Sequence, residues 1–143
     1  MSDLKMERTF PAAPETVFDY LTNTEYLLQW WGPEGISVAK HNLDFSKPGP
    51  WHSTMTNAEG TNYTVSGEVV TVEAPRAVEF TWAWHDENNE RGHESRVRFE
   101  VASDGNGGTR FTMTHSGLAD EESAANHNGG WTSSFVKLER LLG

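Results

Sequence analysis

The sequence of 143 residues contains no cysteine, so disulfide bonds, thiol catalysis and zinc–thiolate sites are excluded together. It also lacks long hydrophobic runs, because nowhere do about eighteen apolar residues follow one another, as a membrane-spanning helix requires. The N-terminal residues MSDLKMERTF contain no apolar stretch of signal-peptide length. We therefore expect a cytoplasmic protein without a membrane partner.

Basic residues are scarce. The chain has 11 Lys and Arg against 21 Asp and Glu, which gives a formal net charge of −10. Such a surface repels nucleic-acid phosphates and anionic lipids, so we expect no nucleic-acid partner, whereas a basic ligand or partner is compatible with this charge. The length is that of a single domain, residues 1–143, and is sufficient to bury a core.

Residues 120–142 show the clearest helical pattern. The apolar face of this segment consists of Trp131, Phe135, Leu138 and Leu142. Asp120 is a suitable N-cap ahead of it. Gly129 and Gly130 interrupt the pattern and cost roughly 1 kcal/mol each relative to alanine. They indicate either a bend or a close approach by another segment, in a long helix that leaves local room beneath it.

Before this helix the pattern is strand, two short helices and six strands. Residues 3–10 alternate as a strand, Pro14 suits the start of a helix over 14–21, and Thr24 suits the cap of a helix ending at Trp31, before Gly32–Pro33. The adjacent Trp30 and Trp31 are interpreted as an anchor of this helix to the sheet, with a cavity lid or an exposed dimer patch as alternatives.

From residue 36 to 115 the hydrophobic period changes to two. Strands are predicted at 36–44, 51–57, 62–73, 77–85, 94–102 and 109–115, separated by turn-forming segments. The sequence therefore predicts an α+β fold in which a bent antiparallel sheet faces the C-terminal helix. Aromatic residues on alternate strand positions would then meet Trp131 and Phe135.

Several short motifs resemble one known family. They are Trp30-Trp31-Gly32-Pro33, Lys47-Pro48-Gly49-Pro50-Trp51, Phe80-Thr81-Trp82, Gly107-Gly108-Thr109-Arg110-Phe111, Thr114-His115-Ser116-Gly117-Leu118 and His127-Asn128-Gly129-Gly130-Trp131. In this order they resemble the activator of heat-shock-protein-90 ATPase homologue family. The resemblance implies a helix-grip fold of the START-like superfamily, a curved sheet of about seven strands around a long C-terminal helix, with room for a ligand between them. It departs at Ser53, where family members often carry a bulkier residue, which predicts a wider cavity.

Two groups of side chains are candidates for the ligand site. The first is an apolar lining made of Trp51, Met55, Tyr63, Trp82, Trp84, Phe99, Met113, Trp131 and Phe135, as is typical of small-molecule pockets. The alternative is that these side chains only fill the core. The second group is His115 and His127, which could orient a polar ligand group or move a proton. For His115 the alternative is a hydrogen bond to the backbone of the turn at Gly117.

Catalytic and metal chemistry have weaker support. His85, Asp86, Glu87, Glu90, His93 and Glu94 carry metal-binding groups, but without fixed spacing and on a polar loop, so we interpret them as a solvated surface. No catalytic residue, metal site or cofactor is predicted. The leading hypothesis is a domain that binds an apolar small molecule, as a monomer or homodimer. The alternatives are a chaperone-associated module, which the resemblance suggests, and a cyclase- or hydrolase-type enzyme.

Overall fold

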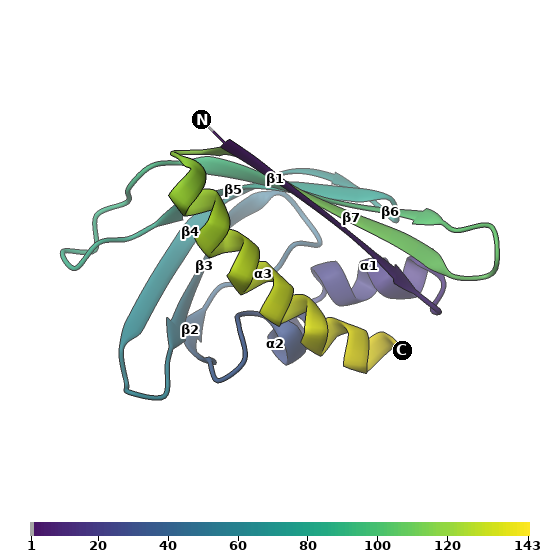
Figure 1. Cartoon of the computed structure of the whole chain (residues 1–143), viewed down its shortest axis with the longest axis horizontal. Coiled ribbons are helices and arrows are strands. Elements are labelled where there is room, and N and C mark those ends of the chain that lie inside the picture. Colours follow the sequence, from purple (N-terminus) through teal and green to yellow (C-terminus); the bar gives the residue numbers. More distant parts are fainter. Residues whose placement is uncertain (1) are drawn as a thin grey trace.

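The computed structural model describes residues 2–143, in which seven strands form one antiparallel sheet of order β1-β7-β6-β5-β4-β3-β2. The strands are β1 (Ser2–Phe10), β2 (Ser37–His41), β3 (Gly49–Thr56), β4 (Asn62–Glu73), β5 (Ala77–Trp84), β6 (Ser95–Ser103) and β7 (Thr109–Leu118). Strands β2 to β7 follow one another as a meander, and β1 closes the far edge against β7 (Figure 1). The predicted α+β fold and the order of its elements are confirmed.

Three helices accompany the sheet: α1 (Pro14–Thr22), α2 (Thr24–Trp30) and α3 (Glu121–Leu142). Pro14 opens α1 as predicted, because its missing N–H would be unpaired at that position anyway. The predicted cap of α2 is one residue off. Asn23 caps this helix by accepting from the Glu25 N–H at 3.1 Å, while the Thr24 hydroxyl donates to the Leu43 carbonyl.

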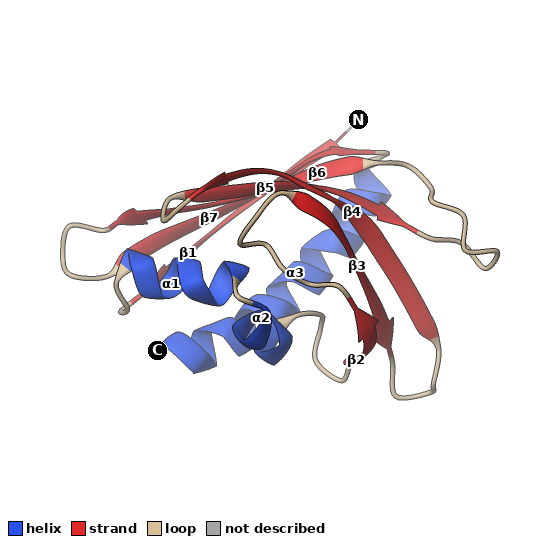
Figure 2. Cartoon of the chain, turned by 180° about the vertical axis from the view of Figure 1, so that it is seen from behind, coloured by secondary structure: helices blue, strands red, loops and turns tan. Residues whose placement is uncertain are grey.

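Helix α3 lies across the concave side of the sheet, and α1 and α2 lie beside it on the same side (Figures 1 and 2). Asp120 caps α3 as predicted, accepting from the Ser123 N–H at 2.8 Å. The buried face of the helix contains Trp131, Phe135, Leu138 and Leu142. The predicted arrangement, with this face against the inner surface of a curved sheet, is therefore confirmed.

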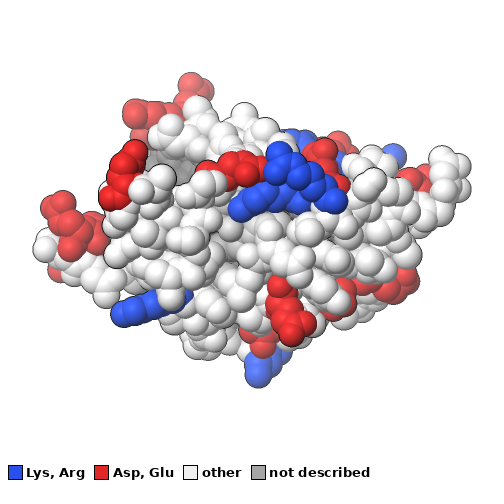
Figure 3. All heavy atoms as spheres, turned by 90° about the horizontal axis from the view of Figure 1, so that it is seen from below, with Lys and Arg blue, Asp and Glu red and all other residues white. Residues whose placement is uncertain are grey.

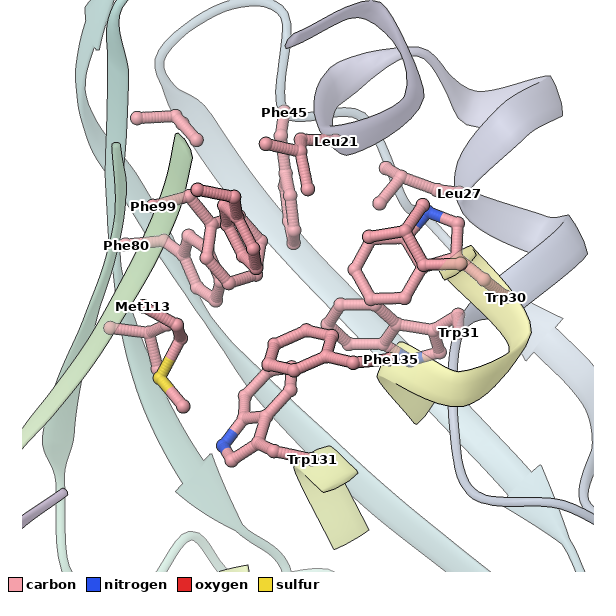
Figure 4. Close-up of a cluster of buried hydrophobic side chains, with 14 of the residues drawn as sticks. Leu21, Leu27, Trp30, Trp31, Phe45, Phe80, Phe99, Met113, Trp131 and Phe135 are labelled. Atoms are coloured by element: carbon pink, nitrogen blue, oxygen red, sulfur yellow. The ribbon is translucent and has the colours of Figure 1, made fainter. Parts of the chain in front are cut away.

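The core is aromatic where α3 meets the sheet (Figure 4). The ring of Phe135 packs edge-on against Phe111 of β7 at 5.2 Å, and the Trp131 ring lies 5.2 Å from Trp82 of β5. Trp30 at the end of α2 is fully buried and donates its indole N–H to the Tyr20 carbonyl at 2.8 Å. Its ring lies 6.1 Å from that of Phe135, so α2 is anchored between α1 and α3.

The predicted strand over 36–44 is too long. Strand β2 ends at His41, and the chain then turns inward so that Leu43 and Phe45 are buried. The Phe45 ring stacks on Phe80 at 4.3 Å, and its backbone N–H donates to the Thr22 carbonyl at 3.0 Å. Contact with α1 and β5 thus replaces the sheet pairing that the local alternation favoured.

The close approach predicted for the two glycines of α3 is wrong. Residues 129 and 130 belong to one continuous helix. A Cβ atom at Gly129 would meet nothing within 4 Å, and one at Gly130 would meet only Pro33 Cγ at 3.9 Å. No backbone approaches closely, and the space beside Gly130 is open.

A close backbone approach is found instead at Gly67 in β4. A Cβ atom here would lie 2.0 Å from the Thr81 carbonyl oxygen, which accepts the indole N–H of Trp51 at 3.2 Å. The Thr81 hydroxyl accepts from the Glu68 N–H at 2.8 Å, so a side chain supplies the bond that regular pairing would give. Gly67 therefore allows β4 and β5 to bend over Trp51.

We expect Gly67→Ala to lower the free energy of unfolding by at least about 2 kcal/mol, because the added methyl group displaces β5 backbone. Gly92→Ala is the matched control, since its Cβ would make an ordinary 3.4 Å contact with the Trp84 carbonyl. It should change stability by about 0.5 kcal/mol or less. Chemical denaturation measures both, and equal stabilities for the two variants would contradict the close approach.

Candidate functional site

A cavity of about 630 Å³ lies between the N-terminal half of α3, the end of β5 and the segment that follows α2. This volume is in the range of sites for small organic molecules. The residues that line it are Trp31, Gly32, Pro33, Met55, Trp82, Trp84, Asp120, Glu122, Ser123, Asn126, His127, Gly130, Trp131 and Ser134. Its walls therefore come from segments far apart in the sequence.

The floor of the cavity is a cluster of indole rings. Trp31, Trp82 and Trp131 are each at least 94% buried, and their ring centroids lie 5.2 to 6.2 Å apart. Strand alternation turns Trp82 inward, and the helical period of α3 directs Trp131 toward it. Figure 4 shows Trp131 and Phe135 extending from α3 toward Trp31 and the sheet.

The mouth of the cavity is polar. Asp120, Glu122 and Asn126 are exposed, while Ser123 and His127 are half-buried. They belong to the cap and first turns of α3, so the carboxylates that complement the helix dipole also border the opening. The cavity thus has an apolar interior and an acidic rim.

His127 is held as a neutral imidazole. Its Nε2 atom accepts the indole N–H of Trp84 at 2.9 Å, so the proton resides on Nδ1, which donates to the Ser123 carbonyl at 2.7 Å. Burial lowers the pKa of His127, and the hydrogen bond to Ser123 acts against this only in part. At neutral pH this side chain adds no charge to the cavity.

His115 lies beneath His127, fully buried, with the two ring centroids 4.9 Å apart. Its Nδ1 accepts from the Trp131 indole at 3.1 Å, and Nε2 donates to the Ser95 hydroxyl at 2.7 Å. Burial, reinforced by His127, lowers the pKa of His115 to about 3. The predicted alternative, a bond to the turn at Gly117, is wrong, because His93 makes that contact with the Gly117 carbonyl at 2.6 Å.

One donor in the cavity wall has no partner. Among residues 2–143, the indole Nε1 of Trp82 is the only buried side-chain nitrogen or oxygen without a hydrogen bond. A buried unpaired donor costs roughly 1–3 kcal/mol relative to a paired one. The neighbouring indoles of Trp84 and Trp131 are both satisfied by histidines, so Trp82 is the exception in this cluster.

The cavity contains five of the eleven predicted lining residues, namely Met55, Trp82, Trp84, His127 and Trp131. Five others, Trp51, Phe99, Met113, His115 and Phe135, are fully packed and do not border it, which is the core-filling alternative. The interpretation of Tyr63 is wrong, because its side chain is 47% exposed. Tyr63 follows the alternation of β4, but it lies near the start of this strand, where the position is exposed to solvent.

Several lining residues were not predicted from the sequence. Ser123, Gly130 and Ser134 share the helical spacing of His127 and border the cavity beside Trp131. Small and polar residues at this spacing were the signal, since a helix facing a cavity needs less apolar bulk than one facing a core. Asp120 is predicted from the sequence only as the N-cap of the helix, and Glu122 is not among the predicted site residues.

The departure at Ser53 does not widen the cavity. Ser53 is fully buried, does not border the cavity, and accepts the indole N–H of Trp31 at 3.0 Å. The small side chain leaves room for Trp31, which is 3% exposed. The interpretation of Trp30 and Trp31 as an exposed patch is therefore wrong, and the anchoring interpretation is confirmed.

No residue of the acidic loop between β5 and β6 borders the cavity. His85 bonds to Ser66 at 2.7 Å and to Asn89 at 2.7 Å, and Arg91 pairs with Glu94 at 3.2 Å. Within residues 2–143, no three His, Asp or Glu side chains are placed to hold a metal ion together.

None of the helices in this part of the chain has both the length and the hydrophobicity to span a bilayer.

Comparison with known proteins identifies close relatives of this fold. Residues 11–143 match the family described as Activator of Hsp90 ATPase homolog 1-like protein, whereas no curated protein matches the sequence. A crystal structure of an AHSA1 protein from Silicibacter pomeroyi is 47% identical, with a TM-score of 0.95 and coverage of 99% of this chain and 97% of that one. A protein from Chromobacterium violaceum has the same fold at 18% identity, with a TM-score of 0.85 over 99% of this chain and 98% of its own.

The buried imidazole of His115 predicts acid sensitivity. Below pH 6.5 the unfolded chain gains a proton at His115 that the folded chain does not accept until about pH 3. Stability should therefore fall by about 1.4 kcal/mol per pH unit for this residue as pH decreases through that window. His115→Gln is less stable at pH 7, but its deficit relative to the native protein should shrink at this rate on acidification.

Urea denaturation at pH 7, 6, 5 and 4.5 measures this deficit. His52→Gln serves as the control because it removes an exposed histidine of β3. On acidification this variant should lose as much unfolding free energy as the native protein. A deficit for His115→Gln that stays constant across the series would show that His115 is not held neutral.

Proposed function

The chain belongs to the Activator of Hsp90 ATPase homolog 1-like family, and we propose that it binds an apolar or aromatic small molecule in the cavity between α3 and the sheet. The observation that carries this proposal is the cavity of about 630 Å³ with a floor of buried indole rings. Apolar surface that a ligand covers there leaves water, at a gain of roughly 25 cal/mol per Å².

The construction of the helix supports a binding role. A side chain at Gly130 would fill part of the space beneath α3 and would improve helix propensity by about 1 kcal/mol. Its Cβ would contact only Pro33 at 3.9 Å, so packing does not require glycine at this position. With glycine at this position the helix is less stable than it would be with a side chain, but the space beneath it stays open as a cavity.

The unpaired donor of Trp82 is a second support. A ligand with a carbonyl, ether or hydroxyl oxygen could accept this N–H once neighbouring side chains shift, because the nitrogen atom itself is buried while the Trp82 side chain borders the cavity. Such a bond would remove the cost of the buried unpaired donor. The preferred ligand is therefore mostly apolar with an acceptor at its inner end.

The arrangement favours binding over catalysis. Both nitrogen atoms of His115 and of His127 already have hydrogen-bond partners within the protein. A general base must reach the proton that it removes, so either imidazole would first have to break one of these bonds. Association with a chaperone, the location in the cytoplasm and the oligomeric state stay predictions.

Gly130→Leu tests the cavity, because a leucine side chain here enters the space beneath α3. With the neutral naphthalene ketone prodan as the probe, we expect saturable binding to the native protein, measured by fluorescence titration. The variant should bind at least tenfold more weakly, since losing the apolar contacts of several methylene groups costs over 1.4 kcal/mol.

Gly129→Leu is the matched control. It changes the neighbouring helical position, which does not border the cavity and where an added Cβ atom meets nothing within 4 Å, and should leave binding unchanged. Thermal unfolding verifies that both variants are folded. Equal binding by Gly130→Leu and the native protein would place the site elsewhere, and the absence of binding across a panel of neutral apolar compounds would refute the proposed function.

A further inference from the structure

We propose that the ligand of this cavity is an organic cation, with a substituted ammonium group at the acidic mouth and an apolar or aromatic body on the tryptophan floor. This inference rests on the proposed function and adds the charge class of the ligand. It is carried by the charges that border the cavity together with the tryptophan side chains beside them.

The ionised groups that border the cavity all have one sign. Asp120 and Glu122 stand at the mouth, and no Lys or Arg of the described residues 2–143 lines the cavity. His127, the remaining titratable side chain in the lining, is neutral through its bonds to Trp84 and Ser123. An anionic ligand would thus meet two carboxylates and no cation.

Basic side chains further along α3 have partners of their own. Lys137 places Nζ 3.5 Å from the Pro33 carbonyl, and Arg140 pairs with Glu34 at 2.6 Å. Neither borders the cavity. Figure 3 shows acidic side chains spread over one face of the molecule and basic ones gathered mainly in one cluster, in keeping with the net charge of −10.

The N-terminus of α3 does not reverse this preference. A free helix N-terminus attracts anions through its unpaired N–H groups. Here the carboxylate of Asp120 already accepts from the Ser123 N–H at 2.8 Å, so the protein supplies its own anion. Glu122, in the first turn and at the mouth, adds further negative charge.

The aromatic lining suits a cation as well as an apolar body. Four of the six tryptophans of the chain, Trp31, Trp82, Trp84 and Trp131, border the cavity. The indole face is the strongest aromatic partner for an ammonium group. Trp84, which is half-buried near the mouth, is the member of this set most accessible to such a group.

Three probes of equal shape test the charge. They are (1-naphthylmethyl)trimethylammonium, its neutral neopentyl isostere and 1-naphthylmethanesulfonate, each titrated as a competitor of prodan at low ionic strength. We expect the ammonium compound to bind about three- to tenfold more tightly than the neutral isostere, and the sulfonate to bind weakest. The advantage of the cation should decrease in 0.5 M NaCl, because salt screens exposed carboxylates.

Substitution at the rim tests the source of the preference. Asp120→Asn keeps a side-chain oxygen for the helix cap, and Glu122→Gln keeps the shape of the side chain. In the double variant, the ratio of the affinity for the ammonium compound to that for the neutral isostere should fall at least about threefold. The affinity for the neutral isostere itself should be unchanged. Glu121→Gln, in the same turn but outside the lining, is the matched control and should behave as the native protein.

The outcomes separate the two proposals. Tighter binding of the neutral isostere or of the sulfonate overturns the cation inference and leaves the apolar site in place. A cation preference that survives in the double variant overturns the role of the two carboxylates. If prodan and all three probes fail to bind, the proposed function is refuted together with the inference.

Discussion

The structure depends on one contact surface, the burial of the aromatic face of α3 against the concave side of the sheet. Trp131 and Phe135 reach β5 and β7 with ring separations of 5.2 Å. Trp30 at the end of α2 and Trp31 directly after it join the same cluster. Each large side chain buried in this way contributes roughly 1.5–3 kcal/mol. Because both α2 and α3 pack on this cluster, it determines where the cavity lies and which rings form its floor.

The two halves of α3 differ in their surroundings. In the C-terminal half Phe135, Leu138 and Leu142 are buried in the core, while in the N-terminal half Ser123, His127 and Gly130 border the cavity. Helix propensity and apolar burial are both lower in the second group. The helix stays continuous there because Asp120 caps it, and because Trp131 is anchored by its bond to His115.

The histidines join the helix to the sheet by specific bonds. His115 and His127 accept the indole N–H groups of Trp131 and Trp84, so each imidazole satisfies a tryptophan of the opposite element. This requires the neutral form, and burial supplies it by lowering both pKa values. The same bonds occupy both nitrogen atoms of each imidazole.

The sequence by itself determined the order of elements, the antiparallel meander and the buried face of α3. Hydrophobic periods of 2 and 3.6 residues are local properties, and they were readable at Phe80, Trp82, Trp131 and Phe135. Only the tertiary structure decided which rings border the cavity and which fill the core. Trp51 and Trp82 have the same alternation, but Trp51 is enclosed by Phe45 and Phe80 while Trp82 faces the opening. That distinction depends on the paths of distant segments such as Leu43–Phe45 and on the close approach of β5 to Gly67. The hydrophobic period within a single strand contains no information about either.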